Sequence, residues 1–459
     1  MGEGKVGSRR GLAVAAVLVA VTAACSSGGG SKTASTTTTP AVAAARSTTA
    51  APTPGPGDFG TLKAVCGPGN AAGATTRGVT DTEIHLGTMA DPSNTVIPGA
   101  GQESFDIGDA FVKWCNAAGG INGRKLVLTK RDSQLFDVGA RMLDACQTDF
   151  MLVGNATPLD QPGLKPRLAC NLAQIPAYVQ SPDVAVAPEQ VVLDGSLHQV
   201  AAGEWRALAK QYPAAFQAIS MITVNGGGLD TFAERQQDAL TTLGDKVVNF
   251  QKAPLTGVDN WRPYTQNALS SGAKAVITLS PDISAFVRSF SDVGFKPDVL
   301  ALGVQNYNAG TIELAKEGVL PTTYVTTSYW PFEAAAQSPP LQQAVALIKA
   351  NSKLTPDFAH MQALTAWLLW AVSAKACGSQ LTGDCVIQKA GALTNWTAGG
   401  LMAPVDTHVG EGVLSQCFVL LKATPAGFVL APDVTMPNTG IFNCDPANVV
   451  AVTNTHTGG

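Results

Sequence analysis

The chain has 459 residues, too many for one ordinary domain, so two or three folded units are expected. Hydrophobic residues make up 45% of the chain and charged residues 14%, which excludes a protein that is disordered as a whole. The formal net charge is −4 and the Lys and Arg residues are spread along the chain without a long basic run, which argues against the clustered basic surface that nucleic-acid binding requires.

The N-terminal segment has the pattern of a secretory signal. Its basic residues come first: Lys5, Arg9 and Arg10. The apolar run from Gly11 to Val21 is shorter than the ~20 residues that span a membrane, and small residues then lead to Cys25. This order resembles the lipobox of bacterial lipoproteins, which implies that residues 1–24 are removed and that Cys25 carries a lipid on the outer face of the cytoplasmic membrane. The alternative is an ordinary signal peptide with a chance cysteine.

The segment after Cys25 has the composition of a linker. Residues 26 to about 60 are rich in Ser, Thr, Ala, Pro and Gly and include the run Thr36–Thr39. Such a composition cannot bury a hydrophobic core. We therefore expect residues 25–76 to form a lipid-anchored tether and the folded part to begin near Arg77.

Apart from Cys25, the chain has eight cysteines: Cys66, Cys115, Cys146, Cys170, Cys377, Cys385, Cys417 and Cys444. An even number in an exported chain indicates disulfides. The sequence has no Cys-x-x-Cys motif and no His at ligand spacing from a cysteine pair, so we expect no metal site. Proximity in sequence favours pairing Cys377 with Cys385 and Cys417 with Cys444, and the remaining four would pair among themselves.

Strand and helix patterns alternate along the middle of the chain. In chain order they are a strand at 83–89, a helix at 102–118, a strand at 125–130, a helix at 137–146, strands at 150–153, 175–179 and 218–224, a helix at 231–243, a strand at 246–251, a helix at 261–271, a strand at 274–279, a helix at 283–293, and strands at 299–302 and 323–327. Such alternation predicts parallel sheets covered by helices on both faces. The strands are too many for one sheet of usual size, which predicts two α/β lobes.

The C-terminal third follows a different pattern. Longer helices are expected at 341–350 and at 358–377, and the second carries Met361, Leu364 and Leu368 on one stripe. A hairpin is expected near the end, with apolar runs at 418–421 and 428–430 on either side of a Pro-Ala-Gly turn.

Several motifs occur in an order shared by one family. The most specific is Asn116–Arg124, which matches the pattern Asn-x-x-Gly-Gly-Ile-x-Gly. The other matching segments are Gly78–Gly87, Val153-Gly154, Ser181-Pro182, Asp259 with Pro263 and Tyr264, and Ser271–Val276. The chain thus resembles the type I periplasmic binding proteins, specifically the branched-chain-amino-acid-binding group of ABC importers, over roughly residues 77–428.

The resemblance implies an α/β fold of two Rossmann-like lobes with parallel sheets, joined by three hinge crossings. Lobe 1 would comprise residues 77–194 and 328–403, lobe 2 residues 195–327 and 404–450, and residues 451–459 a tail. The crossings would fall near 193–195, 326–329 and 402–406. A solute would bind in the cleft between the lobes, at the carboxyl ends of the strands, and the hinge would close around it.

The family's ligand contacts carry over to these positions: Asn155, Ala156, Thr157, Ser181, Asp183, Val184, Gly228, Ser280, Gln305 and Phe358. The acid that pairs with a ligand ammonium in the family aligns with Gln305, which carries no charge. A buried ammonium without a counter-ion is costly. The resemblance therefore implies a solute with an acidic or neutral polar head and no free ammonium, unless Asp183 or Asp282 restores the charge. The alternative role of Thr157 is to cap its own loop. Gly226–Gly228 is either a loop that cradles a phosphate before a helix or, as the favoured interpretation, only a permissive turn.

Catalytic motifs are missing from the sequence. It contains no Gly-x-Ser-x-Gly elbow, no P-loop and no His-Glu-x-x-His motif. We therefore expect a monomeric binding protein without a cofactor. Its expected partners are a small-molecule ligand and an ABC permease, with the membrane contacted only through the lipid and nucleic acid not bound. A sensor without a transport role and, less favoured, a hydrolase on the same lobes are the alternatives.

Overall fold

The computed structural model describes residues 55–226, 228–254, 257–280 and 283–457. The expected signal peptide, Cys25, most of the expected tether and Asp282 lie outside these residues. Within the described ranges, no helix is both long enough and apolar enough to cross a membrane.

The first lobe is built on a four-stranded parallel sheet with the strand order β2-β1-β3-β4. Its elements are β1 (Glu83–Ala90), α1 (Gln102–Ala117), β2 (Lys125–Asp132), α2 (Val138–Thr148), β3 (Met151–Val153), α3 (Gln161–Ala169), β4 (Gln174–Ile175), α4 (Pro182–Ala185), α11 (Pro339–Asn351), α12 (Phe358–Cys377) and α13 (Gly383–Ala390). The strands β3 and β4 are fully buried, as expected for a sheet that is covered on both faces.

Helix α12 is the central helix of this lobe. It packs against α1, α11, α13, β3 and β4, and nearly all of its side chains are buried. A helix that is hydrophobic on every side is typical of a protein core. A capping box starts it: the Asp357 side chain accepts from the backbone N–H of His360, and the His360 side chain bonds the N–H of Asp357.

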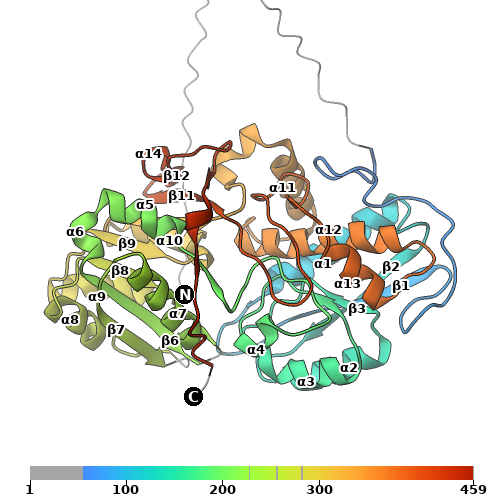
Figure 1. The fold of residues 1–459 in the computed structure, drawn as a ribbon, viewed down its shortest axis with the longest axis horizontal. Coiled ribbons are helices and arrows are strands. Elements are labelled where there is room, and N and C mark those ends of the chain that lie inside the picture. Colours follow the sequence, from blue (N-terminus) through green and yellow to red (C-terminus); the bar gives the residue numbers. More distant parts are fainter. Residues whose placement is uncertain (1–54, 227, 255–256, 281–282, 458–459) are drawn as a thin grey trace, which may run out of the picture. The chain divides into compact units, whose positions relative to one another are not determined.

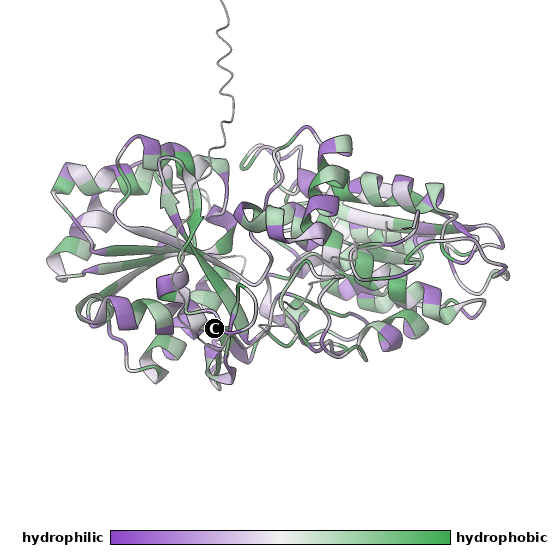
Figure 2. Ribbon diagram, turned by 90° about the horizontal axis from the view of Figure 1, so that it is seen from above, coloured by the Kyte–Doolittle hydropathy of each residue, from purple (hydrophilic) through white to green (hydrophobic). Residues whose placement is uncertain are grey.

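The second lobe contains the larger sheet, with the order β12-β11-β10-β9-β8-β6-β7 and with β13 paired to β11. Its elements are α5 (Gly203–Gln211), α6 (Pro213–Phe216), β6 (Ile219–Asn225), α7 (Leu229–Thr242), β7 (Val247–Pro254), α8 (Arg262–Ser270), β8 (Ala275–Thr278), α9 (Ser284–Val293), β9 (Val299–Leu302), η1 (Val304–Asn306), α10 (Ala309–Lys316), β10 (Thr323–Thr327), β11 (Cys417–Thr424), β12 (Gly427–Leu430), α14 (Pro432–Thr435), β13 (Asn443–Cys444) and η3 (Pro446–Asn448). The short helix η2 (Phe332–Gln337) contacts both α11 of the first lobe and β12 of the second. Strands β6 to β10 run parallel, and β11 and β12 form the expected antiparallel hairpin. Helices flank both sheets (Figure 1), and hydrophobic residues follow the strands of the larger sheet (Figure 2).

The expected elements are largely confirmed, and the differences are local. The strand predicted at 175–179 ends at Ile175, because the chain then turns and the Ala177 N–H bonds the Asn155 carbonyl. The helices α3, α5, α10 and α13 were not predicted. Each is only eight or nine residues long, which leaves little apolar periodicity to detect.

The folded part begins earlier than Arg77, so the expected tether cannot extend to residue 76. The Phe59 side chain is only 1% exposed and packs edge-on against Trp114. The Gln343 side chain accepts from the Gly60 N–H at 2.9 Å and donates to the Asp58 carbonyl at 2.9 Å. These contacts hold residues from Gly55 onward against α1 and α11.

All eight described cysteines form disulfides, with the two expected pairs Cys377–Cys385 and Cys417–Cys444. The other pairs are Cys66–Cys115 and Cys146–Cys170. Cys417 and Cys444 lie directly opposite each other on β11 and β13.

The third crossing lies later in the chain than expected. Val405 pairs with Trp396, and Val409 pairs with Val191 of the first lobe. The chain enters the second lobe only after Glu411, whose carboxylate accepts from the Ser196 hydroxyl at 2.6 Å. Residues 404–410 therefore pack with the first lobe, and the first and third crossings are bonded to each other.

The expected tail is partly held by the fold. Strand β14 (Val449–Ala451) pairs antiparallel with β5 (Gln199–Ala201). Further along, His456 Nε2 lies 2.7 Å from Asp238 Oδ2 on α7. The C-terminal segment thus connects β5, at the start of the second lobe, with helix α7.

Candidate functional site

A cavity of about 220 Å³ lies between the two lobes, beside the hinge. The second lobe contributes the residues that follow β8, β9 and β10, which include Leu279, Gln305 and Ser328. The first lobe contributes Phe358 at the start of α12, and the hinge contributes residues 193–196. Ligands of parallel α/β sheets bind at the carboxyl ends of the strands, and this cavity occupies that position.

Two carboxyl groups line the cavity, one from the hinge and one from the second lobe. Asp194 Oδ2 accepts from Gln362 Nε2 at 2.8 Å, and burial raises the Asp194 pKa. Glu204 lies in the first turn of α5, and burial raises its pKa to about 8. Its Oε2 is buried and has no hydrogen-bond partner among the described residues. At neutral pH the ligand-free protein therefore holds Glu204 mainly as the protonated acid.

Two amide side chains add further hydrogen-bond acceptors. Gln236, on α7, is 7% exposed, and its Oε1 also has no hydrogen-bond partner within the described part of the chain. Gln305 donates its Nε2 to the Leu279 carbonyl at 3.0 Å, which leaves its Oε1 as the group available to a ligand. A buried acceptor without a donor is costly, so the cavity favours a molecule that brings N–H or O–H groups.

The rest of the wall is largely apolar and rigid. Phe232, Phe358 and Phe418 contribute aromatic rings. Phe358 packs edge-on against Tyr329, with ring centroids 5.1 Å apart. Because α12 starts at Phe358, the capping box fixes where this ring enters the cavity. Gln362, one helical turn later on the same face, holds Asp194.

The predicted site residues do not all meet in this cavity. Gln305 and Phe358 line it. Asn155, Thr157 and Val184 instead line a separate cavity of about 20 Å³ within the first lobe, too small for more than about one water. Asn155 and Thr157 thus line a different cavity from Gln305, which the resemblance places in the same site.

The remaining predicted residues make local contacts. Their hydrogen-bond partners are the Met89 carbonyl for the Ala156 N–H, Asp160 for the Ser181 N–H, Gln161 for the Asp183 side chain, and Thr278 Oγ1 for the Ser280 N–H. Gly228 precedes α7 with a φ of +82°, and a Cβ there would lie 2.7 Å from the Gln180 carbonyl oxygen. Glycine at this position therefore allows the second lobe to approach the loop before Ser181.

Sequence reasoning missed Asp194, Glu204 and Gln236. Asp194 falls within the expected first crossing, but nothing about the crossing alone indicates that its side chain faces a cavity. Glu204 and its neighbour Trp205 start the unpredicted helix α5. An acid within the apolar run Val200–Trp205 was the signal available for Glu204.

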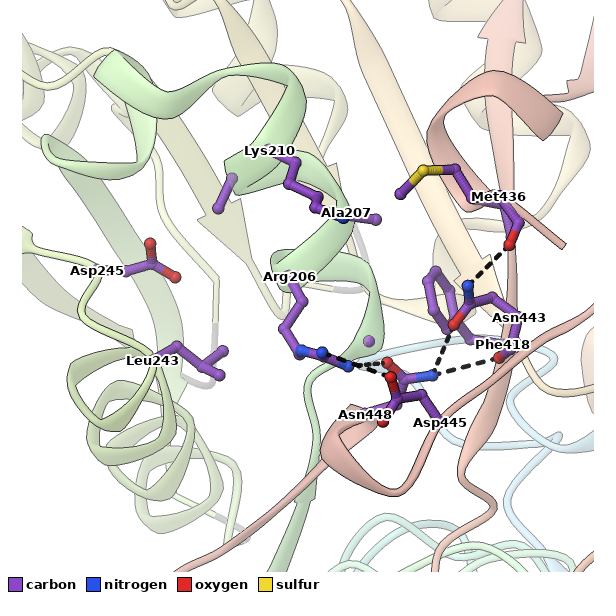
Figure 3. Close-up of a pocket in the computed structure, with 13 residues that line it drawn as sticks. Arg206, Ala207, Lys210, Leu243, Asp245, Phe418, Met436, Asn443, Asp445 and Asn448 are labelled. Atoms are coloured by element: carbon purple, nitrogen blue, oxygen red, sulfur yellow. Dashed lines mark hydrogen bonds and ion pairs between the residues drawn. The ribbon is translucent and has the colours of Figure 1, made fainter. Parts of the chain in front are cut away.

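A second cavity, of about 430 Å³, lies on the other side of α5 (Figure 3). Arg206 spans it, with Nη1 2.6 Å from Asn448 Oδ1 and Nη2 3.7 Å from Asp445 Oδ2. Lys210 and Asp245 lie farther along its wall (Figure 3). All of its lining residues belong to the second lobe and the adjoining C-terminal segment, so lobe closure would not change it. The interlobe cavity is therefore the candidate site.

The sequence pattern of a protein family described as periplasmic binding protein matches residues 97–427. The chain belongs to the periplasmic binding protein family. This family consists of binding proteins, so the chain is a binding protein and not an enzyme. A search of curated proteins found no match.

Solved structures of this family share the fold. A fatty acid ABC transporter substrate-binding protein from Thermomonospora curvata is 13% identical with a TM-score of 0.64, over 83% of this chain and 97% of that one. A leucine-binding protein from Thermotoga maritima is 14% identical with a TM-score of 0.60, over 76% and 97%. A solute-binding protein of an ABC transporter from Rhodopseudomonas palustris, in complex with 3,4-dihydroxybenzoic acid, is 14% identical with a TM-score of 0.58, over 74% and 92%. At these identities the similarity establishes the type I fold.

Proposed function

We propose that this protein is an extracytoplasmic solute-binding lipoprotein that captures a small molecule between its lobes and delivers it to an ABC importer. The observation that carries the proposal is the cavity lined jointly by Phe358 of the first lobe, Asp194 of the hinge and Gln305 of the second lobe. A ligand held by groups from both lobes stabilises the closed arrangement, because an open arrangement loses the contacts with one lobe.

The solved relatives support the transport role. The three named above are described as a fatty acid ABC transporter substrate-binding protein, a leucine-binding protein and the solute-binding protein of an ABC transporter. The ligands named for them differ in chemistry, so the fold accommodates several solute classes. The ligand of this chain therefore has to be inferred from its own cavity.

The proposal also covers location and assembly. The pattern from Lys5 to Cys25 supports export and lipidation, and the Ser- and Thr-rich residues that follow would hold the folded part away from the membrane. The protein would act as a monomer that presents its closed lobes to a permease.

Two measurements test this function. A thermal-shift screen of amines, amino acids, carboxylic acids and sugars should identify a stabilising solute, because a ligand at a hundredfold excess over its Kd adds about 2.7 kcal/mol. Deletion of the gene should abolish uptake of that solute, and the wild-type gene should restore it. Uptake that is unchanged in the deletion strain would refute delivery to an importer.

A further inference from the structure

The ionisable side chains that line the interlobe cavity are both acidic. Asp194 and Glu204 line it, and no Lys, Arg or His is among its described lining residues. The nearest basic side chain along α5, Arg206, lines the other cavity and is engaged by Asn448 and Asp445. An anionic ligand would therefore find no basic side chain in the wall, whereas a cation would pair with the carboxyl groups once they ionise.

The unpartnered atoms of the wall point to the same ligand chemistry. Glu204 Oε2 and Gln236 Oε1 are buried oxygens without a hydrogen-bond partner among the described residues, and Gln236 is more than nine-tenths buried. The indole N–H of the neighbouring Trp205, also without a partner there, lowers the Glu204 pKa but by less than burial raises it. They come from different helices, α5 and α7, and both side chains line one cavity. A protonated amine has up to three N–H donors and a positive charge, so its chemistry matches a carboxylate and an amide oxygen in one cavity.

A carboxylate on the same ligand would find no Lys, Arg or His among the described lining residues. Thr157 and Ser181, two positions to which the family resemblance assigns ligand contacts in the first lobe, do not line this cavity. Thr157 lies in the separate small cavity of the first lobe, and the Ser181 N–H is bonded to Asp160. A zwitterionic amino acid would thus gain an ammonium contact and lose the hydration of its carboxylate.

The size and the apolar wall limit the rest of the ligand. A cavity of about 220 Å³ holds the volume of about seven waters, which corresponds to a compact solute. Phe232 and Phe358 contribute aromatic rings that would pack against an aliphatic body, and aromatic rings also attract a cation over their faces.

We propose that the interlobe cavity binds a small aliphatic amine in its cationic form, without a carboxylate, through Glu204, Gln236 and Asp194. This names the ligand class of the proposed solute-binding function and rests on it. It also replaces the expectation, drawn from Gln305 alone, of a solute with an acidic or neutral head. On binding, the protonated Glu204 loses its proton to solvent and its carboxylate pairs with the ammonium, so near neutral pH the complex forms with proton release.

Calorimetric titration of the full chain with three solutes that share one isobutyl body tests the proposal. The probes are 3-methylbutylamine, leucine and 4-methylpentanoate, which carry an ammonium, both charges and a carboxylate, respectively. We expect the amine to bind at least tenfold more tightly than leucine and the acid not to bind. In two buffers of different ionisation enthalpy, the amine should release up to one proton near pH 7.

The Glu204→Gln variant keeps the side-chain shape and removes the charge. It should weaken amine binding about tenfold or more and abolish proton release. The matched control is Asp245→Asn, because Asp245 is also a carboxyl with an unpartnered buried oxygen but lines the other cavity, and it should leave amine binding unchanged. A thermal melt of each variant confirms folding.

The outcomes separate the two proposals. Tighter binding of leucine or 4-methylpentanoate, or undiminished amine binding by Glu204→Gln, overturns the ligand class. If none of these probes binds, nor putrescine nor trimethylamine, the ligand class is likewise overturned. Binding of a sugar or an acid with loss of its uptake on deletion leaves the solute-binding function intact, whereas unchanged uptake of every solute that binds removes the transport role itself.

Discussion

At the scale of single residues, the carboxyl of Glu204 is buried where its ionised form is unfavourable. Burial raises its pKa from 4.5 to about 8, so the folded chain holds a proton that the unfolded chain releases. The stability associated with this proton is fully present below about pH 4.5 and is lost as the pH rises through about 8. The proposed cationic ligand would offset this loss of stability when it binds.

Glu204→Gln should therefore stabilise the ligand-free protein at alkaline pH. At about pH 9 we expect its free energy of unfolding to exceed that of the wild type by about 1 kcal/mol or more, and near pH 4.5 the two should be equal. Urea unfolding at several pH values measures this difference. A difference that does not change with pH would mean that Glu204 titrates normally in the folded chain.

Gly228 illustrates a close approach between the lobes. Its φ of +82° opposes any side chain, and so does the Gln180 carbonyl oxygen, which would lie 2.7 Å from a Cβ at this position. Gly244 has a similar φ of +86° but open space around it, so it isolates the backbone effect. Alanine should cost about 1 kcal/mol at Gly244, from backbone strain alone. At Gly228 it should cost a further ~1–3 kcal/mol from the clash. Equal losses in urea unfolding would show that the lobes do not approach there.

At the scale of elements, helix α12 connects the core of the first lobe to the binding cavity. Its buried length fixes its position against the sheet, its first residue Phe358 lines the cavity, and Gln362 orients Asp194. A small displacement at the start of this helix would move both contacts together.

Asp357→Ala removes the N-cap of α12 and should reduce stability by about 1 kcal/mol. It should also weaken ligand binding, because the first turn that carries Phe358 frays. Ser338→Ala is the matched control. The Ser338 side chain caps α11 by accepting from the Leu341 N–H, and neither Ser338 nor Leu341 lines the cavity. We expect a similar stability loss there with unchanged affinity, as measured by thermal unfolding and calorimetry. Parallel affinity losses in both variants would contradict the special role of α12.

At the scale of the whole molecule, the disulfides differ in the length of chain that they close. Cys66–Cys115 spans 49 residues and joins the segment before β1 to α1, whereas Cys377–Cys385 spans 8 residues. In the chain-entropy account, removing the first should cost about 4 kcal/mol and removing the second about 2.5 kcal/mol. Double Cys→Ser variants of each pair, compared by urea unfolding, measure the two losses. A larger loss from the short loop would refute the entropic ordering.

The proposed lipid anchor also belongs to this scale. Cys25→Ser should move the protein from the membrane fraction to the soluble fraction, because the proposed tether has no other membrane contact. Incorporation of labelled palmitate into the wild type and not into the variant identifies the lipid. Retention of the variant in membranes, with no label on the wild type, would instead indicate an uncleaved signal.

The sequence by itself was sufficient for the fold class, because strand and helix periodicity and the glycine-rich Asn116–Arg124 motif are local features. The same holds for the pairs Cys377–Cys385 and Cys417–Cys444, whose partners lie close in the chain. It was not sufficient for the start of the folded part. Phe59 lies in a segment with the composition of a linker, but it is buried against Trp114 of α1, which comes more than 40 residues later in the chain.

The composition of the cavity was decided only by the tertiary structure. Asp194 meets Gln362 across 168 residues, and Glu204 and Gln236 converge from separate helices. The family resemblance placed Thr157 and Gln305 in one site, but the arrangement of the lobes places them in different cavities. Periodicity records which face of an element is buried, whereas the charge of a cavity depends on which faces of distant elements come together. That convergence results from long-range packing and hinge geometry, and no short window of sequence encodes it.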